Sequence, residues 1–442
     1  MNKDAITQLE AQLAKWLPTQ RWFSSGETTP SSVSIVESDV LVSGPSTLLW
    51  TLVRIDGGAV YQVPIGLGTG AYVDEVLQGH DAFVIGHVDV DGVEQIAYDA
   101  LVDSSLTLPL FARITNGSIA AELVRPMGAE QSNSSLIYDN KYVLKIFRRL
   151  QEGSNPDLEV TQALTEVKFP NIAPVVATWQ RGDHDLAVCQ PFLVDGTDGW
   201  KLALASARDY FRGEELDPSE VGGDFSSEAE RLGRATAELH LALAECFPAE
   251  TFDVEVLARS LEASLDDVIE GQRPALQTLI AEVRSIPAAE TGPAIRVHGD
   301  YHLGQTLRSV DGWFIFDFEG EPARPLSERT KPTSVFKDVS GMLRSFHYGA
   351  AAGVFEQMPE DQGALQERAE AWEERNRVAF REGYLSTVGV DRVLPGTAEA
   401  QAVLLRAFEV EKAIYELAYE RAHRPTWVPI PQSALDRLLS SV

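Results

Sequence analysis

Three oxygen-bearing side chains surround a short apolar strand in residues 297–322, VHGDYHLGQTLRSVDGWFIFDFEGEP. Asp300 comes first, Gln305 follows five residues later, and Asp317 comes directly after the apolar run WFIF. Phosphoryl transfer requires a carboxylate that orients an attacking hydroxyl and accepts its proton, together with oxygen ligands that hold Mg²⁺ on nucleotide phosphates. The segment therefore predicts Asp300 as a catalytic base, with Gln305 and Asp317 as metal ligands.

Each of these side chains also has an ordinary explanation, because an isolated aspartate usually caps a turn or ends a hairpin strand. The joint arrangement is more specific. Protein kinases separate their catalytic-loop Asp from a metal-binding amide by the same five residues, and a metal-binding Asp follows later in the chain. Several carboxylates at one rim also repel one another unless a cation is present. The pattern favours one phosphotransferase site over three unrelated turns.

A lysine and a glutamate upstream could supply the second half of such a site. Lys145, one of only nine lysines, lies in the β-rich run YVLKIF, and Glu159 follows in a helical pattern. We predict that this pair positions nucleotide phosphates, although an edge-strand lysine facing water is the alternative. The preceding stretch GAEQSNSSL could meet phosphate through backbone N–H groups and the hydroxyls of Ser132, Ser134 and Ser135. Such polar stretches are more often plain turns.

Other motifs indicate no function. Residues 66–71, GLGTGA, match G-x-G-x-x-A, but no βαβ pattern follows, so a glycine-rich hairpin or loop explains them. His298 and His302 have no third zinc ligand nearby and are interpreted as packing or orienting groups. The sequence has only two cysteines, Cys189 and Cys246, which lie in apolar runs and cannot form a disulfide framework.

The composition limits the possible partners. The 442 residues include 66 acidic and 37 basic side chains, for a formal charge of −29. So acidic a surface repels nucleic acids and anionic membranes. No run reaches the roughly 18 apolar residues of a membrane span, and the N-terminal residues form a charged amphipathic helix pattern instead of a signal peptide. The expectation is a cytoplasmic protein that binds neither nucleic acid nor membrane.

The elements that must position these residues are β-rich at first. Residues 31–90 are predicted to form short strands, with a hairpin at RIDGGAVY. A second hairpin is predicted at residues 135–149. A helix is expected to begin at Pro156, with Ser154 or Asn155 as its cap.

Long amphipathic helices dominate from Ser226 onward, interrupted once by a strand-like insert at residues 296–318. The polar, glycine-rich stretch that follows LAVCQPFLV marks a plausible boundary before them. The predicted organisation is a cap subdomain at residues 1–90, an intermediate nucleotide-binding subdomain at 91–195 and a helical C-terminal lobe at 196–442.

Taken together, the motifs resemble actinobacterial maltokinase. The shared stretches extend over essentially the whole chain: QRW at 20–22, QSNSS at 131–135, LKIFRR at 144–149, NPD at 155–157, HGDYHLGQ at 298–305, DFEGEP at 317–322, KDVSGMLRS at 337–345, EKAIYELAYE at 411–420 and HRPTW at 423–427. This set is far more specific than any single signature.

The resemblance implies an α+β, bilobal, protein-kinase-like fold of the aminoglycoside-phosphotransferase kind. A β-rich N-terminal cap subdomain would be added to it, and the C-terminal lobe would be mainly helical. It also implies ATP as cosubstrate and Mg²⁺ as cofactor. The γ-phosphate would pass to the anomeric hydroxyl of maltose, giving α-maltose 1-phosphate for glycogen and α-glucan synthesis from trehalose. A trehalose synthase that supplies maltose is an implied partner.

The same resemblance assigns roles to individual residues. Asp300 would be the base, Gln305 and Asp317 would bind Mg²⁺, and the backbone from Gln190 to Phe192 would form the adenine hinge. Gln305 stands where Asn is common in other small-molecule kinases. Its amide oxygen can still ligate a metal from a longer arm.

The helical pattern near the C-terminus is the candidate sugar site. A disaccharide needs several hydrogen-bonding groups and an aromatic or apolar platform, and this segment offers Glu411, Lys412, Tyr415 and Tyr419. The last three are spaced i, i+3 and i+7, so one helix face can present them all. A solvated, partly packed helix face is the alternative.

Two other functions remain open. The acceptor could be an amino sugar such as glucosamine, or an aminoglycoside, although Lys412 would disfavour an ammonium placed beside it. The chain could also be a non-catalytic, kinase-like module that binds a partner enzyme. A pure scaffold would have no physical need for Asp300, Gln305, Asp317 and Lys145 together.

Overall fold

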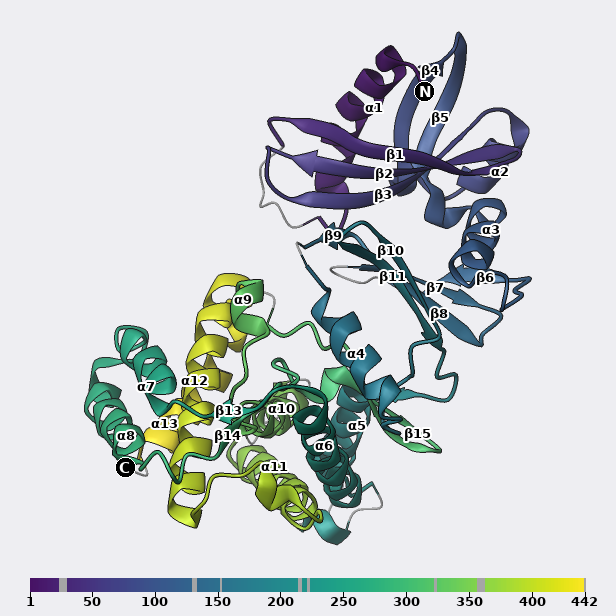
Figure 1. Ribbon diagram of the computed structural model, residues 1–442. Coiled ribbons are helices and arrows are strands. Elements are labelled where there is room, and N and C mark those ends of the chain that lie inside the picture. The colour runs from purple at the N-terminus through teal and green to yellow at the C-terminus, as the bar shows by residue number, and fades with distance from the viewer. Residues whose placement is uncertain are drawn as a thin grey trace. The chain divides into compact units, whose positions relative to one another are not determined.

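The computed structural model describes residues 1–23, 30–128, 133–151, 153–213, 217–220, 223–321, 324–355 and 362–440 (Figure 1). The chain divides into two compact units. The first contains Met1–Gln162 and Ala173–Val194, and the second contains Ala163–Ile172 and Asp195–Val442. Among the described residues, no helix is both long and apolar enough to cross a membrane.

The first unit opens with a helix and an antiparallel sheet. Four apolar side chains of α1 (Lys3–Trp16), spaced along one face, are buried with side chains of the sheet, and Figure 1 shows α1 lying against it. The strand order is β1-β2-β3-β5-β4, with β9 paired to β3. The strands are β1 (Val33–Ser43), β2 (Ser46–Ile55), β3 (Val60–Gly68), β4 (Val84–Val90), β5 (Val93–Asp99) and β9 (Arg149–Leu150).

The hairpin predicted at RIDGGAVY is confirmed, because Arg54 pairs with Val60 and Gly57 turns the chain with a φ of +71°. The predicted cap boundary at residue 90 is wrong. It falls in the turn between β4 and β5, and the sheet continues through β5 to Asp99. The glycine-rich residues 66–71 end β3 and lead into α2 (Ala71–Leu77). Since β3 pairs antiparallel with β5, they belong to no dinucleotide-binding unit.

A second sheet follows, with strand order β10-β11-β8-β7-β6. Its predicted hairpin is confirmed, and Asp139 and Asn140 turn the chain with φ values of +51° and +52°, as a two-residue primed turn requires. Asn155 caps α4 (Pro156–Glu166) as predicted, since its side-chain oxygen accepts from the N–H of Asp157 at 2.9 Å. The strands are β6 (Val124–Pro126), β7 (Asn133–Tyr138), β8 (Tyr142–Phe147), β10 (Ala177–Arg181) and β11 (His184–Pro191).

The helix α3 (Ser104–Ile114) contributes to a core shared by both sheets of the first unit. Phe111 stacks on Tyr138 of β7, with ring centroids 3.9 Å apart. The sequence analysis did not predict this helix, which has Pro109 inside it.

Gln62 of β3 connects the two sheets by hydrogen bonds. Its side-chain oxygen accepts from the indole N–H of Trp50 at 2.8 Å, and its amide nitrogen donates to the carbonyls of Phe147 and Leu186, each at 2.9 Å. The Gln62 amide, the Trp50 indole and both carbonyls are buried, so each needs a hydrogen-bond partner inside the protein. The cap sheet and the Lys145-bearing sheet are thereby fixed to each other.

The second unit is mainly helical, as predicted. Its helices are α5 (Gly199–Arg212), α6 (Ser226–Cys246), α7 (Val254–Ala263), α8 (Arg273–Ser285), α9 (Leu326–Arg329), α10 (Phe336–Phe355), α11 (Gln362–Leu385), α12 (Ala398–His423) and α13 (Pro429–Ser440). Two small sheets contain β12 (Thr197–Asp198), β15 (Thr306–Ser309) and β16 (Gly312–Ile315), and β13 (Glu250–Thr251) with β14 (Pro293–Ala294).

Two glycines let α6 and α11 approach closely. A Cβ atom on Gly233 would collide with the carbonyl of Phe380, and one on Gly383 would collide with the carbonyl of Glu230. This contact brings His240 of α6 beside Tyr384 of α11, where their side chains hydrogen-bond at 2.6 Å.

The Gln62 hydrogen bonds give the first prediction. Gln62→Met keeps a similar volume but leaves the Trp50 indole and two buried carbonyls without their partners. The free energy of unfolding should fall by about 2–4 kcal/mol, as measured by chemical denaturation. The control, Gln78→Met, changes an exposed glutamine beyond α2 and should leave stability within about 0.5 kcal/mol of wild type. Equal stability of the two variants would contradict the prediction.

Candidate active site

The loop that carries Asp300 is held by one face of α10. The N–H groups of His298 and Gly299 donate to the two carboxylate oxygens of Asp338, at 2.7 and 2.8 Å. Asp338 is fully buried and also contacts His240 Nε2 at 3.1 Å. Burial opposes ionisation of Asp338, but the hydrogen bond and charge of His240 outweigh it and lower the pKa. An ionised Asp338 therefore fixes the loop backbone.

Two further positions of α10 complete this support. The hydroxyl of Ser345 accepts from the N–H of Leu303 at 3.1 Å, and a Cβ on Gly341 would lie only 2.5 Å from the carbonyl oxygen of Tyr301. Asp338, Gly341 and Ser345 lie at i, i+3 and i+7, on one helix face. The sequence analysis assigned no role to them. The motif KDVSGMLRS was the available signal, but only as part of the family resemblance.

Asp300 forms an ion pair with a lysine from α12. The ammonium of Lys412 lies 3.0 Å from Asp300 Oδ1 and 2.8 Å from Glu321 Oε1. Burial, the largest influence on Asp300, raises its pKa, but the charge of Lys412, with smaller contributions from His302 and His298, outweighs burial and lowers the pKa to about 2. The same carboxylates raise the pKa of Lys412 well above its usual value despite its burial. The predicted base is thus held ionised.

His298 orients this loop, as expected for a histidine without zinc spacing. Its Nε2 donates to the carbonyl of Phe316 at 3.0 Å, and its Nδ1 lies 3.4 Å from the N–H of Asp300. His302 Nδ1 accepts from the N–H of Gly304 at 3.0 Å. Burial is the main reason why the pKa of His302 is lowered, so this ring favours the neutral form.

A small cavity opens beside Asp300 within the second unit. Glu321 at its wall accepts from Arg324 at 2.5 Å, and Lys337 lies 3.8 Å away. Arg324 also contacts Glu411 at 3.3 Å. The cavity is lined by Gly299, Asp300, Tyr301, Glu321, Arg324, Lys337, Ser340, Gly341, Phe408, Glu411, Lys412 and Tyr415. Its ionic groups are arranged in pairs, next to aromatic surface.

Three of the four predicted sugar-binding residues line this cavity. Glu411 and Lys412 contribute charged groups, and the ring of Tyr415 lies beneath the Lys412 ammonium, 5.0 Å from its centroid. The prediction for Tyr419 is not supported. Tyr419 is 41% exposed, is not among the lining residues and stacks on His423. It lies one turn beyond Tyr415, about 6 Å further along the helix axis, past the cavity.

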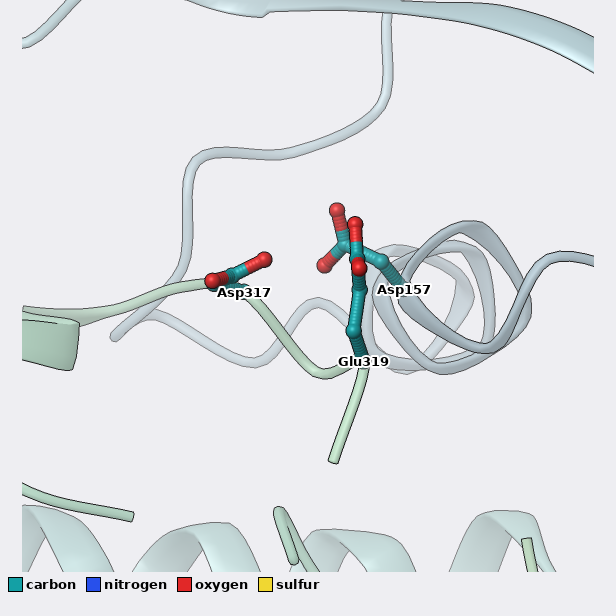
Figure 2. Close-up of side chains that lie close together, drawn as sticks. All are labelled: Asp157, Asp317 and Glu319. Carbon is teal, nitrogen blue, oxygen red and sulfur yellow. The ribbon is translucent and has the colours of Figure 1, made fainter. Parts of the chain in front are cut away.

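Two predicted metal ligands lie together, Gln305 directly before β15 and Asp317 two residues after β16. Gln305 Nε2 donates to Asp317 Oδ2 at 3.0 Å, so the Gln305 amide oxygen is directed away from that carboxylate. Asp317 has a φ of +68°, a left-handed conformation that Asp tolerates better than most residues. The carboxylate of Glu319 brings an oxygen within 4.8 Å of one from Asp317, and Figure 2 shows both side chains. The sequence analysis did not name Glu319 as a ligand.

These oxygen donors fit Mg²⁺, a hard cation that takes carboxylate and carbonyl ligands. Asp317 and Glu319 are the groups of the second unit that would hold it, and Gln305, a predicted ligand, would join them with its amide turned so that the oxygen faces the ion. When bound, the ion would neutralise the charge of the nucleotide phosphates.

In the first unit, Lys145 has the expected kind of partner but at a different position. Its ammonium lies 2.9 Å from Asp157 Oδ2, and Asp157 is buried in the first turn of α4 (Figure 2). Glu159, the predicted partner, is exposed two residues further along, almost opposite Asp157 around the helix. Asp157 therefore has the pairing position that we predicted for Glu159. Since β8 lies inside its sheet, the edge-strand explanation for Lys145 is excluded.

The other predicted nucleotide-binding residues are only partly described. Ser132 lies outside the described residues. The Ser134 hydroxyl accepts from Arg148 Nε at 2.8 Å, and Ser135 is buried in β7. Their contact with phosphate stays a prediction.

The predicted hinge backbone, Gln190 to Phe192, lies at the end of β11. The N–H of Phe192 donates to the carbonyl of Lys141 at 2.8 Å, so this donor already belongs to the sheet. Within a strand, the N–H of one residue and the carbonyl of the residue before it point to opposite edges. The Pro191 carbonyl therefore faces the edge toward β10, two residues beyond Cys189, the last residue of β11 that pairs with β10. The side chain of Gln190 donates to the carbonyl of Ala173 at 2.6 Å, which fixes the adjoining loop. Adenine binding at this backbone stays a prediction, and Pro191 C=O is the group that it would use.

Comparison with known proteins agrees with this architecture. Residues 123–371, more than half of the chain, match the phosphotransferase enzyme family APH, and the chain belongs to this family. Residues 16–103 match the maltokinase N-terminal cap domain. The predicted kinase-like fold with a β-rich cap and a helical C-terminal part is confirmed, and the chain is a phosphotransferase.

The similar proteins include two curated glucosamine kinases. One from Mycolicibacterium smegmatis is 28% identical over 369 residues, 79% of this chain and 88% of the relative. One from Streptacidiphilus jiangxiensis is 27% identical over 331 residues, 70% of this chain and 72% of the relative. The solved structure of a glucosamine kinase in complex with glucosamine, ADP and inorganic phosphate has a TM-score of 0.65 at 21% identity, covering 99% of both chains. These comparisons do not confirm maltose as the acceptor.

The position of Asp300 gives the second prediction. Asp300→Asn removes the proton acceptor while keeping the side-chain size, so kcat for phosphoryl transfer from ATP should fall by about 10²–10⁴-fold. The measurement is ADP release in the presence of acceptor. Asp311→Asn, in the exposed turn between β15 and β16, is the matched control and should keep kcat within about twofold. A loss below tenfold in Asp300→Asn would show that another group is the base.

Proposed function

We propose that this chain is an ATP-dependent kinase that phosphorylates the anomeric hydroxyl of maltose, giving α-maltose 1-phosphate and ADP. One observation carries the choice of a neutral acceptor: the Lys412 ammonium, 3.0 Å from the base Asp300. The maltokinase cap and the motif resemblance along the chain support the same acceptor.

The charges of the cavity favour hydroxyl groups over an ammonium. Asp300 and Glu321 share Lys412, and Glu321 and Glu411 share Arg324. An amino sugar would place a like charge beside Lys412, and such a juxtaposition costs several kcal/mol. The hydroxyls of a neutral sugar can donate to the carboxylates and accept from the cations without displacing either. Tyr415 and Phe408 offer apolar surface for a sugar face.

The reaction follows from these positions. The acceptor hydroxyl donates to Asp300, and its oxygen forms a bond to the γ-phosphorus as the bond between that phosphorus and the ADP oxygen breaks. The proton passes to Asp300, which its ion pair with Lys412 holds ionised beforehand. Lys145, held by Asp157, supplies positive charge for the nucleotide phosphates.

Glucosamine is the second candidate acceptor, because both curated relatives described above are glucosamine kinases. This candidate requires an ammonium to be accommodated in a cavity whose carboxylates already pair with Lys412 and Arg324. The supply of maltose by a trehalose synthase, and the use of the product in α-glucan synthesis, are further parts of the proposal that rest on the family resemblance.

An acceptor panel tests the proposal. The protein with Mg²⁺ and ATP should release ADP with maltose at a kcat/KM at least about tenfold above that with glucosamine or an aminoglycoside, since one unfavourable charge contact costs more than 1.4 kcal/mol. The product's phosphorylated carbon and anomeric configuration are determined by NMR. Greater turnover of glucosamine, or no ADP release that depends on maltose, would contradict the proposal.

Lys412 gives a sharper prediction. In Lys412→Met the charge that lowers the Asp300 pKa is lost and burial, which raises it, prevails. Because the ionised carboxylate is the active form, the acid limb of the kcat/KM profile should move to higher pH, by about 1–3 units. The ratio of kcat/KM for glucosamine over maltose should also rise, since Asp300 and Glu321 would then lack this cation.

The control for this experiment is Lys337→Met. Lys337 lines the same cavity and lies 3.8 Å from Glu321, but its charge is not among the main influences on Asp300. The acid limb of the kcat/KM profile of Lys337→Met should shift by less than about 0.5 pH unit. Equal acid limbs in wild type and Lys412→Met would show that Lys412 does not govern the base.

A further inference from the structure

Glu411 of α12 is fixed by a residue that is not among those lining the cavity. The hydroxyl of Ser260, in α7, donates to Glu411 Oε1 at 2.6 Å. Arg324 donates to the same oxygen at 3.3 Å. The helix α7 packs against α12, as Figure 1 shows, and all three residues belong to the second unit. The Ser260 hydroxyl therefore fixes one particular oxygen of a carboxylate at the cavity wall.

The residue before the cap of α7 supports a second cavity residue of α12. Phe408 lies one helical turn before Glu411, and its ring packs against that of Phe252, with centroids 5.8 Å apart. Both phenylalanines are buried. Phe408, Glu411 and Tyr415 line the cavity at i, i+3 and i+7, on one face of α12. The α7 segment thus supports two of the three groups that this face presents to an acceptor.

The three carboxylates that line the cavity differ in how their oxygens are engaged. Both oxygens of Glu321 accept from cations, Oε1 from Lys412 and Oε2 from Arg324, and only 3% of this side chain is exposed. Asp300 accepts with Oδ1 and Glu411 with Oε1, and no hydrogen bond reaches Asp300 Oδ2 or Glu411 Oε2 within the part of the chain that the structure describes. Their side chains are 21% and 15% exposed. Two carboxylate oxygens can therefore accept from the hydroxyls of an acceptor.

We propose that Ser260 is a positioning residue that sets the Glu411 carboxylate so that its Oε2 accepts from an acceptor hydroxyl other than the one that is phosphorylated. Asp300 Oδ2 takes the reacting hydroxyl, and Glu411 Oε2 takes the second one. A carboxylate that two donors already fix loses less rotational freedom when the acceptor binds, so the second hydroxyl is held more tightly. The inference rests on the proposed function, because it places a sugar in this cavity.

Steady-state kinetics of Ser260→Ala with Mg²⁺, ATP and maltose test the inference. Loss of this hydrogen bond to the carboxylate should raise the KM for maltose by about three- to tenfold, whereas kcat and the KM for ATP stay within about twofold. In a Glu411→Gln background, Ser260→Ala should cause less than about a twofold further change in the KM for maltose, because Ser260 acts through that carboxylate.

A panel of monodeoxy maltoses that keep the anomeric hydroxyl identifies the second hydroxyl. The analogue that lacks it should have a kcat/KM that Ser260→Ala changes by less than about twofold, since the bond that Ser260 supports is already missing. The other analogues should lose about three- to tenfold in kcat/KM, as maltose does. An equal loss for every analogue would show that Ser260 does not act on a substrate hydroxyl.

Ser264→Ala is the matched control. Ser264 directly follows α7, and its hydroxyl donates to the carbonyl of Ser260 at 3.1 Å, but among the described residues it makes no bond to Glu411. Removing it should leave the KM for maltose and kcat within about twofold of wild type. The comparison separates the positioning of Glu411 from a general weakening of α7.

An unchanged KM for maltose in Ser260→Ala, or an equal rise in Ser264→Ala, would overturn the inference. Wild-type protein that phosphorylates glucosamine but not maltose would contradict the proposed acceptor instead. The same variants measured with glucosamine would then decide the inference by the same changes in KM. Wild-type protein that phosphorylates neither sugar would contradict both the proposed function and the inference.

Discussion

The ion pair between Lys412 and Asp300 is the interaction on which the proposed chemistry depends most. A base at the floor of a partly enclosed cavity would tend to protonate, because burial disfavours its charge. Lys412 reverses that tendency and simultaneously pairs with Glu321, a side chain only 3% exposed. The pairing also has a cost, because the Lys412 ammonium attracts the Asp300 lone pair that must accept the proton of the hydroxyl. A buried ion pair is weak evidence for stability, so its position at the base is better explained by the reaction.

The residues proposed to carry chemistry could be named from local motifs, whereas their supports could not. Asp300, Gln305, Asp317 and Lys145 belong to local motifs whose spacing is itself the signal. The partner of Lys145 depends instead on which face of α4 meets the sheet, and spacing alone could not distinguish Asp157 from Glu159. Likewise, Tyr419 has the correct helical phase but lies a turn beyond the cavity, and the end of a cavity along a helix is set by tertiary packing.

In the fold, too, local features could be predicted from the sequence and long-range features could not. Hairpins were predictable because Asp-Gly-Gly and Asp-Asn turns act locally through φ > 0, as Gly57, Asp139 and Asn140 confirm. The boundary at residue 90 was wrong because a turn that ends a domain and a turn inside a hairpin have the same local composition. Pairing across a sheet is a long-range property, so only the structure shows that β5 belongs to the cap.

The two units solve a similar electrostatic problem in different ways. In an acidic protein, with 66 acidic against 37 basic side chains, a cation placed in the interior is readily neutralised, but each of its donors must still find an acceptor. Lys412, a compact charge with three donors, joins two carboxylates from the same catalytic segment. Arg148, a planar fork, instead joins a cap carboxylate to a hydroxyl in the next sheet. A point charge suits the control of a neighbouring pKa, whereas a fork transmits orientation. The buried carboxylate of the cap therefore fixes the cap sheet to the sheet that carries Lys145.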